Sequence, residues 1–344
     1  MARAAGRCVL VTGAGGFIGA EMVRRLAASG AGRMVLLDAA EQPLFRIHAD
    51  MMREGYGDRC APVLGSVCDA ALLRGLFEEH RPEMVLHAAA LKHVPLMERN
   101  PVAAVETNAL GTWRVAKAAA AHGARAMVLV STDKAVAPHS IMGAAKRIAE
   151  LVMLDEAGAM RCAAVRLANV IGSPGSVGPL FEEQLLRGEP MTVTHPEAKR
   201  YFLTLAEVAA LLAQAMDSDA AEGVLIPDPG EPVRIVDLAR RMMAAAGRLE
   251  TIAMVGLRPG DKLDESLMGA DERDGGPATR DLRRVQCSVP ANLEPRLRDV
   301  ETAMAGRDVA ALLRVTMDLV PGYEPSAVLR EAVLRQSVAE MAQP

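Results

Sequence analysis

The 344-residue chain has few aromatic side chains, no cysteine pair at metal-binding spacing and no long apolar run. Aromatic residues make up only 3%, so aliphatic side chains and the 20 methionines must fill the core. The five cysteines form no C-x-x-C pair and have no histidine at zinc spacing, so we expect reduced thiols and no metal site. Because no run of ~18 apolar residues occurs, we expect no membrane span and a cytoplasmic protein.

The chain also has no excess of positive charge. Lys and Arg total 39 against 43 Asp and Glu, which gives a formal net charge of -4. This balance excludes a broadly basic nucleic-acid binder, so any site for an anionic ligand must be local. Hydrophobic residues make up 51% of the chain, which is enough for one large or two ordinary globular domains.

Short apolar segments alternate with segments of helical periodicity from residue 8 to about residue 170. Such alternation predicts parallel β/α units, and strands that are nearly continuous in apolar residues predict a sheet covered on both faces. We therefore expect an α/β fold of the Rossmann type, a doubly wound parallel sheet whose ligand lies at the carboxyl ends of the strands. The expected strands cover residues 8–11, 34–38, 61–65, 84–90, 126–131 and 163–169.

The pattern loosens after residue 172, which predicts a second, smaller mixed α/β lobe. We place the domain boundary there, with the Rossmann domain at 1–172 and the lobe with the C-terminal helices at 173–344, parts of which pack back on the first domain. The polar stretch 270–284 is expected to be a mobile loop. Helices are expected near 179–188, 205–217, 234–246, 309–320 and 327–341.

The turn after the first strand carries glycines at positions 13, 16 and 19, in the sequence TGAGGFIG. Gly13 permits a tight turn, Gly16 lets the backbone approach a pyrophosphate, and Gly19 permits close helix packing. Asp38 ends the second strand about 20 residues later, where a carboxylate accepts hydrogen bonds from an adenosine ribose and repels a 2′-phosphate. No arginine follows closely, so the pattern favours NAD over NADP; the alternative is a glycine-rich turn without a ligand.

A hydroxyl, a carboxylate and an ammonium follow one another where the fifth strand ends, at Thr132, Asp133 and Lys134. The carboxyl end of a strand is the expected place for catalysis in this architecture. Met142 and Lys146 lie one turn apart on one face of the next predicted helix, which lets both face the same cleft. These five residues form the candidate catalytic group.

The glycine pattern and the later helix resemble those of the extended short-chain dehydrogenase/reductases, whose hallmark is Tyr-x-x-x-Lys. Met142 stands at the tyrosine position. None of Tyr56, Tyr201 and Tyr323 precedes a lysine by four residues, so no displaced copy of the motif exists. Methionine has no titratable proton, and alcohol oxidation by a tyrosinate is therefore excluded.

One branch with methionine at this position is the CapD-like polysaccharide-biosynthesis nucleotide-sugar 4,6-dehydratases, which the chain resembles over nearly its whole length. The resemblance implies an NAD+-dependent lyase that converts UDP-N-acetylglucosamine or a close analogue to a UDP-4-keto-6-deoxy sugar. Its steps are oxidation at C4, elimination of water across C5 and C6, and hydride return to C6, so a tightly bound NAD+ is recycled. The stretches that carry the resemblance are HAAALKHVPLMERNP at 87–101, TNALGT at 107–112, STDKAVAP at 131–138, MGAAKRIAE at 142–150, PMTVTHPEAKRYFLT at 190–204, GEPVRIVDLARRM at 230–242 and GLRPGDK at 256–262.

The resemblance implies a role for each catalytic candidate. Thr132 hydrogen-bonds the C4 oxygen, Asp133 protonates O6 and Lys134 removes H5. Lys146 holds the nicotinamide ribose and lowers the proton affinity of the C4 hydroxyl, while Met142 packs beside the sugar or nicotinamide, or belongs to the core. The implied cofactor-binding residues are Gly13, Gly16, Phe17, Ile18, Gly19, Asp38, Ala88, Ala89, Lys92, Asn108 and Lys146. The implied substrate-binding residues are Lys92, His93, Asn169, Arg200 and Arg258.

These roles need shifted proton affinities. An exposed aspartate has a pKa of ~3.9 and an exposed lysine one of ~10.4, so both Asp133 and Lys134 must be shifted to act at neutral pH. A direct ion pair between them would oppose both shifts. His93 is either a cleft residue or a structural histidine, and Asn108 steadies the backbone near the site.

Four positions depart from the family pattern. Ala168 and Pro174 stand where the family has glycine and arginine, which removes a cation and stiffens a substrate-side loop. Ser66 and Ala40 replace an aspartate and a serine near the adenosine, and Ser66 predicts a weaker adenine contact. The exact sugar, the nucleotide base and the pathway stay open.

Three functions fit these residues. A dehydratase leads, and a C4 or C5 epimerase with the same transient oxidation is second; Asp133 disfavours it, because an acid at O6 is needed only for elimination. The third is an NAD-binding regulator without catalysis. Many relatives of the methionine type carry membrane helices before this domain, so the chain is either a form without them or an excised domain. We expect a homo-oligomer, with the helix predicted at 102–123 as a candidate interface.

Overall fold

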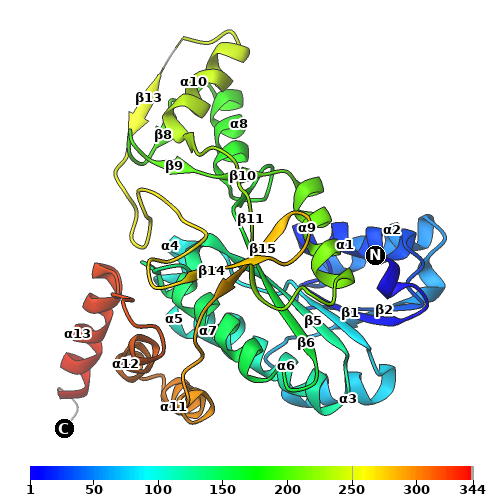
Figure 1. The fold of residues 1–344 in the computed structure, drawn as a ribbon. Helices are drawn as coiled ribbons and strands as arrows, with labels where there is room; N and C mark the ends of the chain where they lie inside the picture. Colours follow the sequence, from blue (N-terminus) through cyan, green and yellow to red (C-terminus); the bar gives the residue numbers. More distant parts are fainter. Residues whose placement is uncertain (250, 342–344) are drawn as a thin grey trace.

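The computed structural model describes residues 1–249 and 251–341, and within them the central sheet has nine strands (Figure 1). Seven are parallel, in the order β11-β6-β5-β4-β1-β2-β3, and β15 and β14 add an antiparallel pair at one edge. The order reverses between β1 and β4, which is where ligands bind in such sheets. The expected α/β fold of the Rossmann type is confirmed. The first six strands are β1 (Cys8–Thr12), β2 (Arg33–Asp38), β3 (Cys60–Leu64), β4 (Met84–His87), β5 (Ala126–Thr132) and β6 (Arg161–Leu167).

Alternate residues of each strand face opposite layers of helices. In β1, Val9 and Val11 pack under one layer and Leu10 under the other. Both faces are thus covered, which explains why these strands are mostly apolar. One layer contains α1 (Phe17–Ala28), α2 (Glu41–Arg53) and α9 (Leu205–Asp217) (Figure 1). The other contains α3 (Ala70–His80), α6 (Gly111–Ala121) and α7 (Ile141–Asp155).

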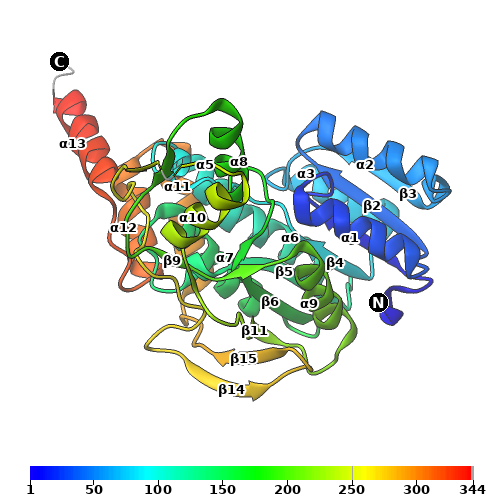
Figure 2. The ribbon, with the colours of Figure 1, turned by 90° about the horizontal axis from the view of Figure 1, so that it is seen from above.

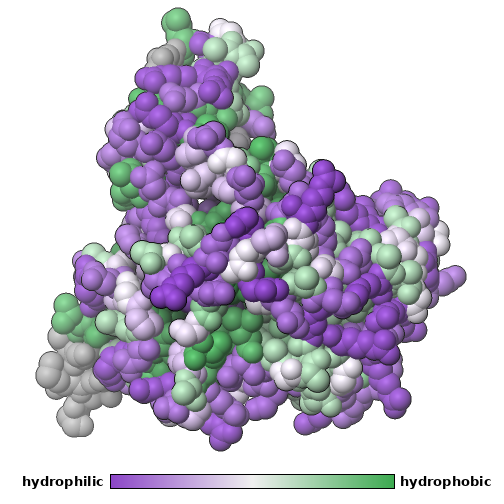
Figure 3. Space-filling model, in the orientation of Figure 1, coloured by the Kyte–Doolittle hydropathy of each residue, from purple (hydrophilic) through white to green (hydrophobic). Residues whose placement is uncertain are grey.

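A small lobe stands on the carboxyl side of the sheet. Its core contains Phe181, Met191 and Val236, among other apolar side chains. The lobe stands out from the body in Figure 3, where most of the visible surface is hydrophilic. Its main elements are α8 (Val177–Arg187), β8 (Met191–Val193), α10 (Ile235–Ala245) and β13 (Ile252–Met254). Short strand pairs at its base join β9 (Lys199–Arg200) to β12 (Val233–Arg234) and β10 (Phe202–Leu203) to β7 (Asn169–Val170).

The chain returns from the lobe to the main sheet. β11 (Gly223–Pro227) pairs with β6, and β14 (Arg273–Pro277) with β15 (Leu282–Gln286) forms a hairpin at its edge. The expectation of a mobile loop at 270–284 is therefore wrong. Ala278, Leu282 and Val285 are buried, β15 pairs with β11, and Glu272 forms an ion pair with Arg166, so the segment is held on the sheet despite its many charged residues.

Three helices close the chain: α11 (Leu293–Ala305), α12 (Val309–Leu319) and α13 (Ala327–Met341). They pack with α7 and α5 (Pro101–Val105), and α12 and α13 lie at the end of the molecule opposite β2 and β3 (Figure 2). The helix expected at 102–123 is divided by a π-helical turn at residues 106–110. No helix within the described ranges has both the length and the apolar character needed to cross a bilayer.

Candidate active site

The glycine turn after β1 presents backbone N–H groups at the start of α1. Gly13 has φ of +64°, and a Cβ there would lie 2.8 Å from the nitrogen of Ala89. A Cβ on Gly19 would lie 2.0 Å from the Gly13 carbonyl oxygen, so a larger residue would push the helix away from the turn. Among the described residues, no side chain caps α1, and its first turn carries no acid. Its N–H groups and positive dipole end are therefore available to an anion.

The Asp38 carboxylate at the end of β2 holds this turn in place. Its Oδ2 accepts a hydrogen bond from the Gly15 N–H at 2.9 Å, and its Oδ1 accepts one from the Ala40 N–H at 2.9 Å. Each oxygen keeps a second lone pair. The carboxylate can therefore organise the turn and still accept hydroxyl groups from a ligand.

A buried hydrogen-bond chain links β1 to α6 beneath this turn. Thr12 Oγ1 lies 2.6 Å from His87 Nδ1, and His87 Nε2 lies 2.9 Å from Thr112 Oγ1. Thr112 donates its own proton to the Asn108 carbonyl at 2.8 Å, so Nε2 donates to Thr112 and Nδ1 accepts from Thr12. Burial lowers the pKa of His87 to about 3, and the ring stays neutral. His87 was not identified from the sequence.

Asn108 fixes the loop that carries Lys92 and His93. Its Oδ1 accepts from the Leu91 N–H and its Nδ2 donates to the Leu91 carbonyl, both at 2.8 Å. Asn108 lies in the π-helical turn, a local irregularity that is common at functional sites. Lys92 and His93 are exposed, and a Cβ on Gly175 would lie 2.3 Å from His93 Cε1. The loop that carries the unusual Pro174 thus lies against His93.

Thr132, Asp133 and Lys134 lie together at the carboxyl end of β5. Lys134 Nζ and Thr132 Oγ1 both donate to Asp133 Oδ1 at 2.9 Å. Asp133 is fully buried, and its Oδ2 has no hydrogen-bond partner within the described part of the chain. Burial lowers the pKa of Lys134, but the Asp133 and Glu265 carboxylates outweigh burial and the net shift is upward. The ion pair that would oppose the catalytic shifts is present.

Helix α7 places Lys146 and Met142 in different surroundings. Lys146 Nζ donates to the Val130 carbonyl at 2.7 Å, beside the end of β5. Burial lowers its pKa to about 8. Met142 is 3% exposed and packs in the hydrophobic core between α7 and the C-terminal helices. Met142, which stands where the wider superfamily has tyrosine, is therefore surrounded by apolar side chains.

Arg200 holds the segment after residue 256 near the catalytic group. Its Nη1 donates to the carbonyls of Lys199 at 2.7 Å and Leu263 at 2.8 Å. Its Nη2 donates to the Lys262 carbonyl at 2.6 Å. Most of its donors are thus directed at the backbone.

The other two candidates beyond residue 168 occupy different settings. Arg258 is exposed, and its Nε donates to Asp261 Oδ2 at 2.8 Å. Asn169 is half-buried, and its Nδ2 donates to the Tyr201 carbonyl at 3.3 Å. The Arg258 side chain is 57% exposed and that of Arg200 only 14%, so Arg258 is the more accessible of these two candidate arginines.

A buried network of four charges lies behind the catalytic group. Arg166 in β6 donates to both oxygens of Glu150 at 3.0 and 2.8 Å and to both oxygens of Glu272 at 2.6 and 2.7 Å. Arg147 lies 2.9 Å from Glu150 and 3.2 Å from Glu272. Ser131 donates to Glu150 at 2.6 Å, which ties the network to the residue before Thr132. The two positive charges of the arginines compensate the two negative charges of the glutamates. The bond from Ser131 connects this network to the end of β5.

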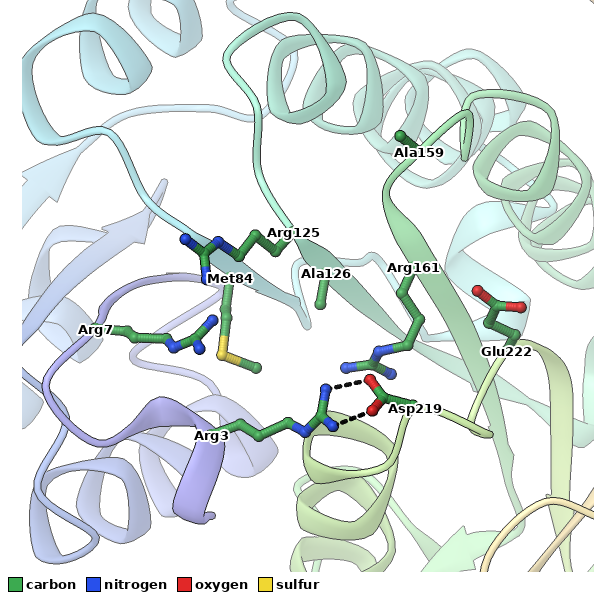
Figure 4. A pocket seen from close by; sticks show the side chains of 9 residues that line it. All are labelled: Arg3, Arg7, Met84, Arg125, Ala126, Ala159, Arg161, Asp219 and Glu222. Atoms are coloured by element: carbon green, nitrogen blue, oxygen red, sulfur yellow. Dashed lines mark hydrogen bonds and ion pairs between the residues drawn. The ribbon is translucent and has the colours of Figure 1, made fainter.

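A separate cavity of about 450 Å³ lies at the opposite, amino ends of β4, β5 and β6 (Figure 4). Arg3, Arg7, Arg125 and Arg161 line it, and Arg3 pairs with Asp219. The full length of β5 separates this cavity from Thr132. No group of three or more residues suited to a metal occurs in the described ranges.

Sequence comparison places the chain among polysaccharide-biosynthesis proteins. Residues 9–286 match the model of a family described as polysaccharide biosynthesis protein. The chain is 43% identical over 274 residues to the capsular polysaccharide biosynthesis protein CapD of Staphylococcus aureus, covering 77% of this chain and 46% of the relative. It is 41% identical over 276 residues to the probable polysaccharide biosynthesis protein EpsC of Bacillus subtilis, covering 78% and 46%. The chain spans about half the length of these curated relatives.

Solved structures share the fold. Pen from Bacillus thuringiensis is similar with a TM-score of 0.74 and 27% identity, covering 84% of this chain and 90% of that one. The UDP-glucose 4-epimerase of Thermus thermophilus, solved in complex with NAD, has a TM-score of 0.65 and 25% identity, covering 75% and 89%. With the family model matched over most of its length, the chain belongs to the polysaccharide biosynthesis protein family.

Proposed function

We propose that the chain is an NAD+-dependent nucleotide-sugar 4,6-dehydratase that acts on UDP-N-acetylglucosamine or a close analogue. The observation that carries this proposal is the 2.9 Å contact between Asp133 and Lys134 at the carboxyl end of β5. It supplies an acid and a base side by side in a chain with Met142 in place of a catalytic tyrosine. The names of the CapD and EpsC relatives support a role in making a polysaccharide precursor.

The residues around the glycine turn fit NAD+. The free N–H groups of α1 suit a pyrophosphate, and the remaining lone pairs of Asp38 suit an adenosine ribose. The similar Thermus epimerase was solved with NAD, which supports the same cofactor here. When bound, the nicotinamide would take hydride from C4 of the sugar and return it to C6. We place the cofactor-binding part at residues 1–172 and the nucleotide-sugar lobe with the C-terminal helices at 173–344.

The pair Asp133 and Lys134 carries the elimination. Lys134 must be neutral to take H5, and Asp133 must be protonated to give a proton to O6. Transfer of one proton from Lys134 Nζ to Asp133 Oδ1 along their contact produces both forms at once. Elimination then leaves the H5 proton on Lys134 and an anionic Asp133, so the ion pair is restored without a further transfer between the two residues.

The remaining site residues bind and orient the sugar nucleotide. We assign Thr132 to a hydrogen bond with the C4 oxygen and Lys146 to the nicotinamide ribose. Arg258 and Arg200 are the proposed diphosphate contacts, because guanidinium groups match phosphate oxygens. Lys92, His93 and Asn169 are the proposed contacts to the sugar and its neighbouring phosphate.

An epimerase is the second candidate, because UDP-glucose 4-epimerases are among the similar proteins. One from Rickettsia rickettsii is 32% identical over 212 residues, covering 60% of this chain. The two reactions share C4 oxidation but differ in whether the C6 hydroxyl leaves. The buried Asp133 beside Lys134 favours the dehydratase, since only elimination uses an acid at O6.

Incubation with UDP-N-acetylglucosamine in heavy water tests the proposal. A product lighter by one water, with deuterium at C5, is the expected result. A sugar of unchanged mass apart from deuterium would instead support epimerisation. If neither water loss nor exchange occurs with NAD+ added, the proposed reaction on this substrate is wrong, and other nucleotide sugars should be tried because of Pro174.

A further inference from the structure

Glu265 is a buried carboxylate close to the catalytic group that the sequence motifs did not single out. It follows the GLRPGDK stretch by three residues. Its side chain is 2% exposed, and its Oε2 has no hydrogen-bond partner among the described residues. A buried carboxylate is costly unless neighbouring charges compensate it. The charged groups around Glu265 therefore determine whether its carboxylate is stable in this buried position.

Three cations from three segments surround this carboxylate. Lys134 Nζ lies 3.6 Å from Oε1, and Arg200 Nε lies 3.8 Å from the same oxygen. Lys262 Nζ lies 3.9 Å from Oε2. These distances are within ion-pair range but longer than a hydrogen bond. Glu265 thus acts on its neighbours through its charge more than through directed hydrogen bonds.

The backbone on both sides of Glu265 is anchored. Arg200 donates to the carbonyls of Lys262 and Leu263 before it. Arg166 donates to the Leu267 carbonyl at 3.0 Å after it. Arg166 also pairs with Glu150 of the main domain, and Arg200 lies in β9 at the base of the lobe. The Glu265 carboxylate is therefore held at a fixed place beside the Lys134 ammonium.

We propose that Glu265 is a positioning residue that holds the Lys134 ammonium from the side of the lobe, while Asp133 holds it from β5. The charged groups that face Lys134 are then Asp133 and Glu265, which attract it, and Arg200 and Lys262, which repel it. This role rests on the proposed function, because Lys134 needs such positioning only if it removes H5. Its hold on the ammonium can nevertheless be measured without a substrate.

The test is trace acetylation of lysines in the intact protein with acetic anhydride at pH 8, followed by peptide mass spectrometry. Only a neutral amine reacts, and Lys117 on the surface serves as the internal reference. Removing a unit charge at 3.6 Å lowers the pKa of Lys134 by on the order of one pH unit, even with the screening of water. Glu265→Gln should therefore raise the ratio of Lys134 to Lys117 labelling roughly tenfold.

Two variants separate charge from packing. Asp264→Asn removes the same charge one residue away, on an exposed side chain, and should change the ratio less than about twofold. Glu265→Asp keeps the charge but shortens the side chain, and should stay within about threefold of the wild type. An unchanged ratio in Glu265→Gln overturns the proposal, and so does an equal rise in Glu265→Asp, which would indicate greater access to Lys134. If the ratio rises as expected but the wild type never exchanges H5, the proposed reaction fails while the hold of Glu265 on Lys134 stands.

Discussion

Replacing Arg166 with methionine should destabilise the fold by about 3 kcal/mol at neutral pH. The Arg166 guanidinium is fully buried and contacts all four carboxylate oxygens of Glu150 and Glu272. Burial raises the pKa of Glu150, but Arg166 and Arg147 outweigh it and hold that pKa at about 2, against 4.5. The difference between 4.5 and about 2, at about 1.36 kcal/mol per pH unit, gives roughly 3 kcal/mol. Loss of one partner from a buried ion pair has about the same cost.

Urea unfolding followed by circular dichroism measures this change. Arg298→Met is the matched control, because Arg298 is 70% exposed and pairs with Glu294 at 3.0 Å; it should cost less than about 1 kcal/mol. Adding Glu150→Gln and Glu272→Gln to the Arg166 variant should recover part of the loss, since no buried charge is then left unpaired.

The pH dependence gives a second check. The pKa of Glu150 is lower in the folded protein, so its contribution is complete above pH 4.5 and disappears as the pH falls through that value toward about 2. The stability gap between the wild type and Arg166→Met should therefore narrow below pH 4.5. A variant within about 1 kcal/mol of the wild type at pH 7, or a gap that does not narrow in acid, would refute this account of the network.

The other predictions concern the active site. Lys134→Ala should abolish exchange of H5 with heavy water while NAD+ binding is retained, and measurable exchange in this variant would remove Lys134 as the base. Asp133→Asn should still exchange H5 but lose water about 10²- to 10⁴-fold more slowly, as expected for loss of a general acid; normal elimination would contradict the assignment. Asp38→Ala should weaken NAD+ binding and relax the preference over NADP+, as measured by fluorescence titration of both cofactors. Unchanged affinity for both would mean that another group holds the ribose.

The strands of the central sheet could be predicted because each is marked by a pattern of neighbouring residues in the sequence. Residues 34–37 and 126–130 are all apolar, a pattern typical of a strand covered on both faces in an α/β chain. The hairpin of β14 and β15 could not be predicted in the same way. Its charged sequence is typical of a loop, whereas in the structure it pairs with β11 and buries Ala278, Leu282 and Val285.

The candidate site was predictable where a motif is contiguous and not where partners meet only in the fold. Thr132, Asp133 and Lys134 are neighbours in sequence, so their clustering at a strand end followed from the pattern. Glu265 reaches Lys134 only because the segment between β13 and β14 folds against residues that follow β5. His87 lay within a stretch that carried the family resemblance, but its contacts to Thr12 and Thr112 depend on strand order and helix position.

The two lysines of the site lie in opposite electrostatic surroundings, and this contrast separates their tasks. Lys134 lies between two carboxylates, which raise its pKa, and in the proposed elimination it passes its proton to Asp133 within the pair. Lys146 contacts a backbone carbonyl in a buried position, and its pKa of about 8 lets it exchange a proton with solvent near working pH. Since transfer within the pair leaves the total number of bound protons unchanged, it does not depend on bulk pH. A change in turnover near pH 8 would then report the charge of Lys146, which we propose holds the cofactor, and not the state of the Asp133 and Lys134 pair proposed for elimination.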